Sequence, residues 1–352
     1  MRLPGQDRVG RPLLKSGKKP DLTGGKGGAP LKRESMNLKS VISLLGRLVL
    51  AFLGAAAVIA CTPSAKNETS SPAQAVFEPD PPHVCDFCER LNEPMAPFQV
   101  YGNTYYVGTA MISSVLIASD DGLVLINGGM TQTAPRIVDN IEALGFSLAD
   151  LKLIFNSHPH FDHAGGIAAL ERATGAEVAA SIESAKALEM GHPTEDDPQR
   201  GIEDNVFPAV PDVRAVKDGE ALAVGDVKIT ARYMPGHTPG SAAWTWRSCE
   251  EDRCLDVVFA DTFSTRSAPG FRFTDDPERV ETFRNSIAKV AGLPCDILLA
   301  PSPLSIDVEA KLKAREEDPE TNPFIDPDAC RAYAEAGTGR LEKRLAEEAS
   351  DQ

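Results

Sequence analysis

The chain has 352 residues, of which 42% are hydrophobic and 25% charged; this composition fits a folded globular protein and excludes a mainly disordered one. Its charge is unevenly divided. Residues 1–60 hold 11 Lys or Arg and 3 Asp or Glu, a net charge of +8, whereas residues 61–352 hold 25 Lys or Arg and 48 Asp or Glu, a net charge of −23. So acidic a body repels phosphate backbones, and we expect no nucleic-acid partner.

The first 60 residues have the features of an export signal. The uncharged run 48–60 is shorter than the roughly 20 residues that span a bilayer, but it fits the core of a signal peptide and is preceded by basic residues. Cys61 follows it directly in a sequence that resembles the bacterial lipobox, in which the cysteine is acylated; a secreted protein with a free Cys61 is the alternative. We therefore expect a periplasmic, lipid-anchored protein. Residues 1–35 would be a mis-assigned start or an extension, 36–60 a signal peptide, 61–75 a flexible tether and 76–352 one folded domain.

Six further cysteines form an even set, which an exported protein can pair. Two pairs are close in sequence, and two cysteines complete the set: Cys85 with Cys88, Cys249 with Cys254, and Cys295 with Cys330. A zinc ribbon is the alternative for Cys85-x-x-Cys88, but it needs a second close pair of matching kind, and the periplasm favours oxidised thiols. We expect structural disulfides.

From residue 98 onward, short apolar runs alternate with amphipathic stretches. In the first half the patterns predict a hairpin of strands 114–118 and 123–126 that turns at Asp120-Asp121-Gly122. A helix over 133–144, a buried strand over 151–155 and two helices over 166–174 and 182–190 are expected to follow. In the second half they predict three strands over 227–231, 242–246 and 255–260. A helix over 276–290, a strand over 297–299 and a helix over 330–348 are expected to follow. This order predicts an α/β (α+β) fold with two sheets stacked face to face and helices outside.

The segment Ser157-His158-Pro159-His160-Phe161-Asp162-His163-Ala164-Gly165-Gly166 carries the strongest chemical signal. Only six histidines exist in the chain, and three of them fall here, directly after a buried strand, together with one carboxylate. This set of donors at this spacing indicates a metal site rather than a histidine-rich surface loop. His158 and His160 can point to one side of the loop, whereas Asp162 and His163 diverge and can serve a second metal.

His237 is the expected third ligand of the first metal. It lies between glycines and prolines in a loop that follows a predicted strand, as the first cluster does. With water in the fourth position, His158, His160 and His237 would form a catalytic tetrahedral zinc site. His192 is most simply an exposed loop residue, and neither it nor His83 can be assigned from sequence as a ligand of the second metal.

These motifs resemble those of the metallo-β-lactamases, particularly of their third subclass. The resemblance covers most of residues 80–350 and rests on the segments 101–109, 156–166, 236–241, 260–264 and 322–334. It implies an αββα sandwich of two mixed sheets, and it implies that Cys249 pairs with Cys254 and Cys295 with Cys330. It also implies a β-lactam substrate, a zinc cofactor and, for Asp162, the orientation of the hydroxide that attacks the lactam.

Three further positions take candidate roles from this resemblance. Thr262 and Ser264 would lie beside the second metal and the substrate carboxylate, although such hydroxyls near a strand end are more often local caps. Asp261 resembles an aspartate that bridges two metals in related hydrolases, but alignment with the lactamases argues against that role.

Two residues depart from the family pattern. Ser302 stands where the subclass has a histidine ligand of the second zinc, and a hydroxyl is a poor replacement for an imidazole. Asn127 stands where an aspartate commonly supports the ligands, and its missing charge is expected to loosen them. We expect a monomeric zinc β-lactamase with one tight and one weak or absent zinc; the alternatives are a hydrolase of lactones or phosphodiesters, or a zinc-binding lipoprotein with little catalysis.

Overall fold

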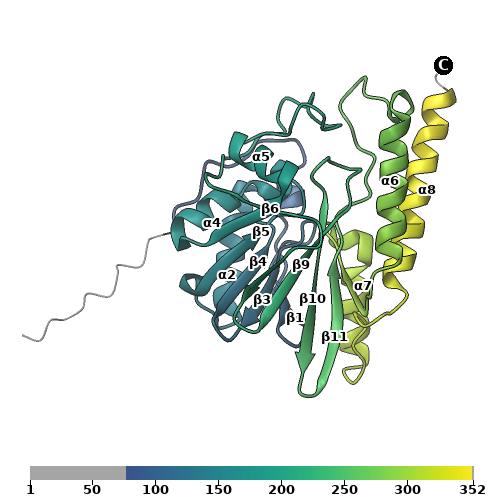
Figure 1. Ribbon diagram of the computed structural model, residues 1–352. Helices are drawn as coiled ribbons and strands as arrows, with labels where there is room; N and C mark the ends of the chain where they lie inside the picture. Colours follow the sequence, from purple (N-terminus) through teal and green to yellow (C-terminus); the bar gives the residue numbers. More distant parts are fainter. Residues whose placement is uncertain (1–76, 351–352) are drawn as a thin grey trace, which may run out of the picture. The chain divides into compact units, whose positions relative to one another are not determined.

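Two β-sheets lie face to face in the computed structural model, which describes residues 77–350 (Figure 1). The predicted start, signal peptide, Cys61 and tether lie outside the described residues. Within 77–350, no helix is both long and apolar enough to cross a bilayer.

The first sheet has seven strands in chain order and mixes both pairing directions. Its first four strands pair antiparallel and the rest are added in parallel, so helices connect the later strands. The strands are β1 Phe98–Tyr101, β2 Thr104–Tyr106, β3 Val115–Ser119, β4 Gly122–Ile126, β5 Leu151–Phe155, β6 Glu177–Ser181 and β7 Arg214–Val216.

The second sheet has five strands in the order β12-β11-β10-β9-β8. Four of them form an antiparallel meander, and β12 joins β11 in parallel. The strands are β8 Ala221–Val224, β9 Val227–Tyr233, β10 Ala242–Glu250, β11 Arg253–Phe259 and β12 Ile297–Leu299.

Helices cover the outer sides of the sandwich, as Figure 1 shows. Buried side chains of α2 Ala134–Ala143, α4 Ile167–Thr174 and α5 Ile182–Met190 pack on the outer face of the first sheet. Those of α6 Pro277–Ala291 and α8 Ala329–Ser350 pack in the cluster that also fills the space between the sheets. The remaining helices are α1 Cys88–Leu91, α3 Phe161–Ala164 and α7 Val308–Glu317. The predicted four-layer αββα arrangement is therefore confirmed.

The apolar runs of the sequence are explained by burial on two sides. In β4, Leu123 and Leu125 face the outer helices, whereas Val124 and Ile126 face the second sheet. A strand covered on both faces needs no polar alternation, so it reads as a continuous apolar run. Trp244 packs into the inter-sheet cluster as a fully buried residue.

The expected elements and all three disulfides are present. Cys85 pairs with Cys88, Cys249 with Cys254 beside the turn of the β10–β11 hairpin, and Cys295 with Cys330. The sequence did not predict five short strands, the four-residue helices α1 and α3, or α7. The missed strands β1, β2, β6, β7 and β8 have three to five residues each, too few for periodicity alone to identify a strand. The predicted strand β12 is as short, but it consists wholly of Ile and Leu.

Candidate metal centre

The histidine-rich loop begins where β5 ends and turns directly into α3 and α4. Close backbone contact shapes this turn: a Cβ atom on Gly166 would lie 2.2 Å from the Gly128 carbonyl oxygen, and one on Gly165 would lie 2.6 Å from that of Phe161. Only glycine fits at both positions. The glycine pair therefore lets this turn lie directly against the neighbouring backbone.

Asn127 fixes the start of this loop. Its backbone is left-handed, with φ of 65°, a conformation that asparagine tolerates better than most residues. Its Oδ1 accepts a hydrogen bond from the Ser157 amide at 2.9 Å, and its Nδ2 donates to Ser157 Oγ at 3.1 Å. Asn127 thus supports the residue before His158 without carrying a charge.

Three histidines from two distant segments bring their rings together; we call His158, His160 and His237 the three-histidine site. One nitrogen of each ring lies within 4.8 Å of the other two. The ring centroids are 4.9 Å apart in every pair, and the ring planes are nearly perpendicular. All three residues are buried, with exposed fractions of 1–4%. The sequence-predicted first ligand set is therefore assembled by the fold.

A separate hydrogen bond orients each of these rings. Asp261 Oδ1 lies 2.6 Å from His158 Nδ1, and Asp197 Oδ2 lies 3.2 Å from His160 Nε2. The Ser264 carbonyl oxygen accepts from His237 Nδ1 at 2.9 Å. The second nitrogen of each ring is left for a metal, an arrangement common among metal-binding histidines.

The protonation states suit metal binding. Burial, followed by the neighbouring histidines, holds the pKa of His158 well below its usual value. The same causes lower the pKa of His237 to about 3. Both rings are neutral at pH 7 and keep a free lone pair, which ligation requires. Buried neutral imidazoles are donors that fit zinc and similar divalent ions.

A second group of donors lies beside the first and consists of His158, Asp162 and His163. We call this group the second site. Asp162 Oδ2 lies 3.3 Å from His163 Nε2. Burial alone raises the pKa of Asp162, but the adjacent histidines, above all His163, outweigh it and hold that pKa far below its usual value. The carboxylate is therefore ionised at neutral pH.

Ser302 begins the short turn Pro303–Ile306, and its side chain does not cap that turn. The donors that the second site has to itself are Asp162 and His163, because the one free nitrogen of His158 belongs to the three-histidine site.

The other candidate residues take supporting positions. Thr262 Oγ1 and Ser264 Oγ accept hydrogen bonds from the amides of Ser264 and Arg266, so both hydroxyls act as local caps. Asp261 is absent from both donor groups and instead orients His158. His192 is half-buried in the turn after α5 and belongs to neither group.

Asp197 and Gln199 are part of the site and carried no signal in the sequence. Both are buried in the irregular segment between α5 and β7. Gln199 Nε2 lies 3.3 Å from His160 Nδ1 and 3.4 Å from His237 Nε2, the two nitrogens that Asp197 and Ser264 leave free. No sequence motif surrounds either residue. Each reaches the site only because the long loop that carries it passes over the histidines.

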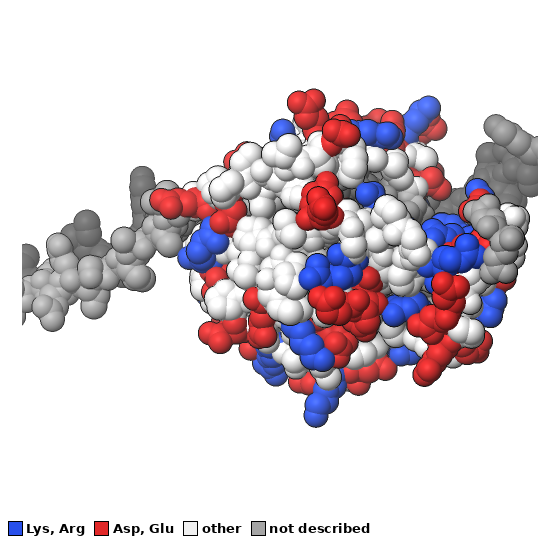
Figure 2. All heavy atoms as spheres, turned by 90° about the horizontal axis from the view of Figure 1, so that it is seen from above, with Lys and Arg blue, Asp and Glu red and all other residues white. Residues whose placement is uncertain are grey.

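The site lies where β9 and β11 end and β10 begins, at the upper edge of the sandwich in Figure 1. Figure 2 looks onto this edge: charged side chains of both signs gather around its margin, and a broad uncharged area lies among them.

Comparison with known proteins agrees with this geometry. The model of the metallo-beta-lactamase superfamily matches residues 107–302. Rm3 metallo-beta-lactamase is 44% identical, with a TM-score of 0.73, over 75% of this chain and 99% of that chain. MEM-A1, a subclass B3 metallo-beta-lactamase from a soil metagenome library, is 45% identical, with a TM-score of 0.72, over 74% and 100%. BJP-1, a subclass B3 enzyme of Bradyrhizobium japonicum, is 34% identical, with a TM-score of 0.69, over 75% and 99%.

Curated relatives match a shorter stretch. A hydroxyacylglutathione hydrolase of Anaeromyxobacter dehalogenans is 32% identical over 140 residues, 40% of this chain and 44% of that protein. The N-acyl homoserine lactonase AttM of Agrobacterium fabrum is 28% identical over 142 residues, 38% and 52%. The chain spans about half the length of these curated relatives. Because the family model covers more than half of the chain, the chain belongs to the metallo-beta-lactamase superfamily.

Proposed function

We propose that this chain is a zinc-dependent β-lactamase that hydrolyses the amide bond of β-lactam antibiotics. The observation that carries the proposal is the convergence of His158, His160 and His237 beside Asp162 in a chain whose structural relatives are subclass B3 metallo-beta-lactamases. The superfamily scaffold serves several hydrolases, so the substrate is argued from these relatives and the site together.

His158, His160 and His237 would hold a zinc ion, which would act as a Lewis acid and lower the pKa of a bound water to about 7. The chain contributes the rest. Asp261 and Asp197 keep two rings aligned, and the ionised Asp162 accepts a hydrogen bond from the attacking water and directs it toward the lactam carbonyl carbon. Thr262 and Ser264 keep hydroxyl protons that can be donated to the substrate carboxylate, because their oxygens act only as acceptors in the local caps.

The second site is proposed to hold zinc weakly. Asp162 and His163 supply one carboxylate and one imidazole, and Ser302 stands in the place of the remaining ligand. Structural and catalytic zinc sites rely on Cys, His, Asp and Glu, so a hydroxyl contributes little. We propose one tightly bound zinc ion and a second that is weak or absent.

Metal titration tests the proposal. Chelator-stripped protein should not hydrolyse a chromogenic cephalosporin, and one equivalent of zinc should restore most of the rate. Two equally tight zinc sites would contradict the weak second site, and equal rates with and without zinc would contradict the mechanism.

A lactone or thioester hydrolase is the second candidate, favoured by the curated relatives that match through this part of the chain. The same zinc-loaded sample should be assayed with an acyl lactone, a glutathione thioester and a bis-aryl phosphate. A higher kcat/KM for any of these than for every β-lactam would replace the proposal. Zinc binding with no hydrolysis of any substrate would instead indicate a metal-binding lipoprotein.

We also propose that the protein is exported and anchored through an acylated Cys61, and that it is a monomer. The apolar run 48–60 and the cysteine that follows it support export and the lipid anchor. Labelled fatty acid should be incorporated by the wild-type chain and not by Cys61→Ser, which should move to the soluble fraction. Gel filtration of the released domain should give the monomer mass.

A further inference from the structure

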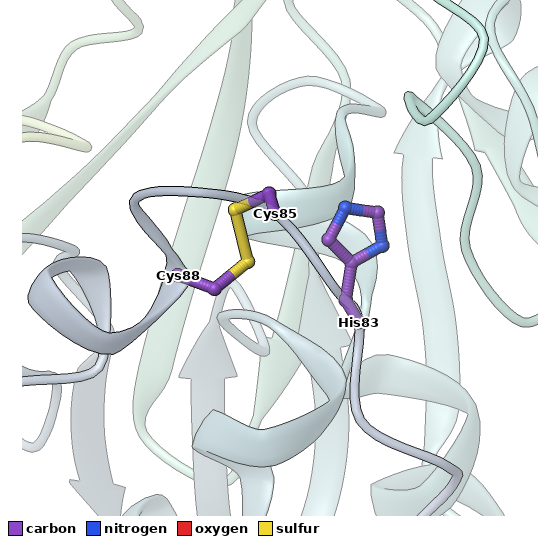
Figure 3. A group of neighbouring side chains, drawn as sticks. All are labelled: His83, Cys85 and Cys88. Carbon is purple, nitrogen blue, oxygen red and sulfur yellow. A yellow bond between two sulfur atoms is a disulfide. The ribbon is translucent and has the colours of Figure 1, made fainter.

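We propose that His83, Cys85 and Cys88 form a third metal site, separate from the catalytic centre, that binds zinc when the Cys85–Cys88 disulfide is reduced. Figure 3 shows the three side chains on the segment that leads into α1. A ring nitrogen of His83 and the two sulfur atoms all lie within 4.8 Å of one another. Two thiolates and one imidazole are a frequent zinc donor set, with the fourth position open to water.

The histidine is held in place, and one of its ring nitrogens is unsatisfied within residues 77–350. Its Nε2 atom is buried and has no hydrogen-bond partner among the described residues. Its ring stacks on Phe161 with centroids 4.1 Å apart. Its backbone amide donates to Thr131 Oγ1 at 2.8 Å, and its carbonyl accepts from Gln132 Nε2 at 2.9 Å. A buried polar atom without a partner is costly, and a metal would satisfy it.

The cysteines are also prearranged. Cys88 is buried against Ile112 and Met130, whereas Cys85 is partly exposed. The Cys88 amide donates to the Cys85 carbonyl oxygen at 3.2 Å, which closes the turn between them. Reduction therefore leaves two thiols that need only separate to non-bonded distance while the backbone stays in place.

The chemistry balances with a dithiol as reductant. A thiolate of the dithiol attacks the partly exposed Cys85 sulfur, and its second thiol resolves the mixed disulfide. The products are two protein thiols and the cyclic disulfide of the reductant. Zinc then displaces two protons from the thiols as it binds. The oxidised protein offers only the His83 imidazole, so the site exists in one redox state.

Cobalt(II) replaces zinc as the probe, because thiolate ligation gives it a near-ultraviolet charge-transfer band that His and Asp ligands do not produce. The protein is reduced with dithiothreitol, freed of reductant under nitrogen and titrated with cobalt before and after reduction. We expect one additional equivalent and the thiolate band only after reduction, and loss of both on adding zinc. Alkylation and peptide mass analysis establish which disulfide was opened.

Two variants separate this site from other thiols. His83→Gln should keep the thiols but weaken the added cobalt site by about tenfold or more, because one imidazole ligand is lost. Cys85→Ser/Cys88→Ser should abolish the band. It retains Cys249 and Cys254, a pair also close in sequence that has no grouped histidine among the described residues. A band that persists in the double variant, or full affinity in His83→Gln, would overturn the proposal. So would reduced Cys85 and Cys88 without a band. None of these outcomes depends on β-lactamase activity.

Discussion

The Asp261 carboxylate and the His158 imidazole form a buried pair, with Oδ1 2.6 Å from Nδ1 and both side chains at most 1% exposed. Asp261 follows β11 and His158 follows β5, so the bond joins the ends of the two sheets. This contact directs the other nitrogen of His158 toward the metal position. An aspartate that resembled a bridging ligand is thus an orienting residue.

Asp261→Asn should weaken zinc binding about 10–100-fold, the usual cost of losing a partner behind a metal-bound histidine. The amide is nearly the same size, but it lacks the charge that increases the basicity of the ring. Competition with a chromogenic chelator measures the affinity. Asp252→Asn, at the exposed end of the β10–β11 hairpin, is the matched control and should bind zinc as the wild type does.

Gln199→Glu should close the open coordination position of the three-histidine site. The Gln199 amide nitrogen lies 3.3 and 3.4 Å from two of the nitrogens that face the metal, so a carboxylate there becomes a fourth ligand. We expect tighter zinc binding and a rate of hydrolysis lower by about 100-fold or more, since closed sites leave no position for water. Gln199→Ala should not tighten zinc binding; if both variants bind zinc equally, the carboxylate is not a ligand.

Ser302→His should strengthen the second site. An imidazole replaces a hydroxyl at a position whose side chain caps nothing, so the turn Pro303–Ile306 should be undisturbed. Isothermal titration should show second-zinc affinity higher by roughly tenfold or more. Ser302→Ala is the control and should resemble the wild type. No gain in the histidine variant would mean that residue 302 does not face Asp162 and His163.

Glu348 should make folding stability depend on acid pH. Its carboxylate accepts hydrogen bonds from the Phe273 and Thr274 amides at 3.0 and 2.8 Å and pairs with Arg344. Burial alone raises its pKa, but these bonds outweigh burial and lower the pKa to about 2. Because the folded pKa lies below the unfolded one, the stabilisation is complete above the ordinary pKa of 4.5 and is lost as pH falls toward 2.

Glu348→Gln should therefore lower the free energy of unfolding by about 2–3 kcal/mol at pH 7 and by much less near pH 2–3. Urea unfolding at both pH values measures the difference. Glu347→Gln, an exposed neighbour, should change stability little at either pH. A Glu348→Gln effect that is independent of pH would show that packing, and not charge, is responsible.

Local patterns in the sequence predicted much of the scaffold and the ligand set. The β3–β4 hairpin, the strand β5 and the helices α2, α4 and α6 follow from apolar spacing and turn residues within a dozen positions. His158, His160, Asp162 and His163 lie within six residues, so their proximity needed no tertiary information.

Tertiary structure alone decided what stands behind those ligands. Asp197 reaches His160 across 37 residues, and Asp261 reaches His158 across 103. Such partners depend on where loops pass in space, and loops carry no hydrophobic period that a sequence could reveal. The sequence by itself determined the fold class and the metal-binding motif, because both depend on the spacing of residues that are close together in the sequence. The direction of each imidazole, the place of Gln199 and the His83 nitrogen that has no partner in the described part of the chain exist only after distant segments have packed.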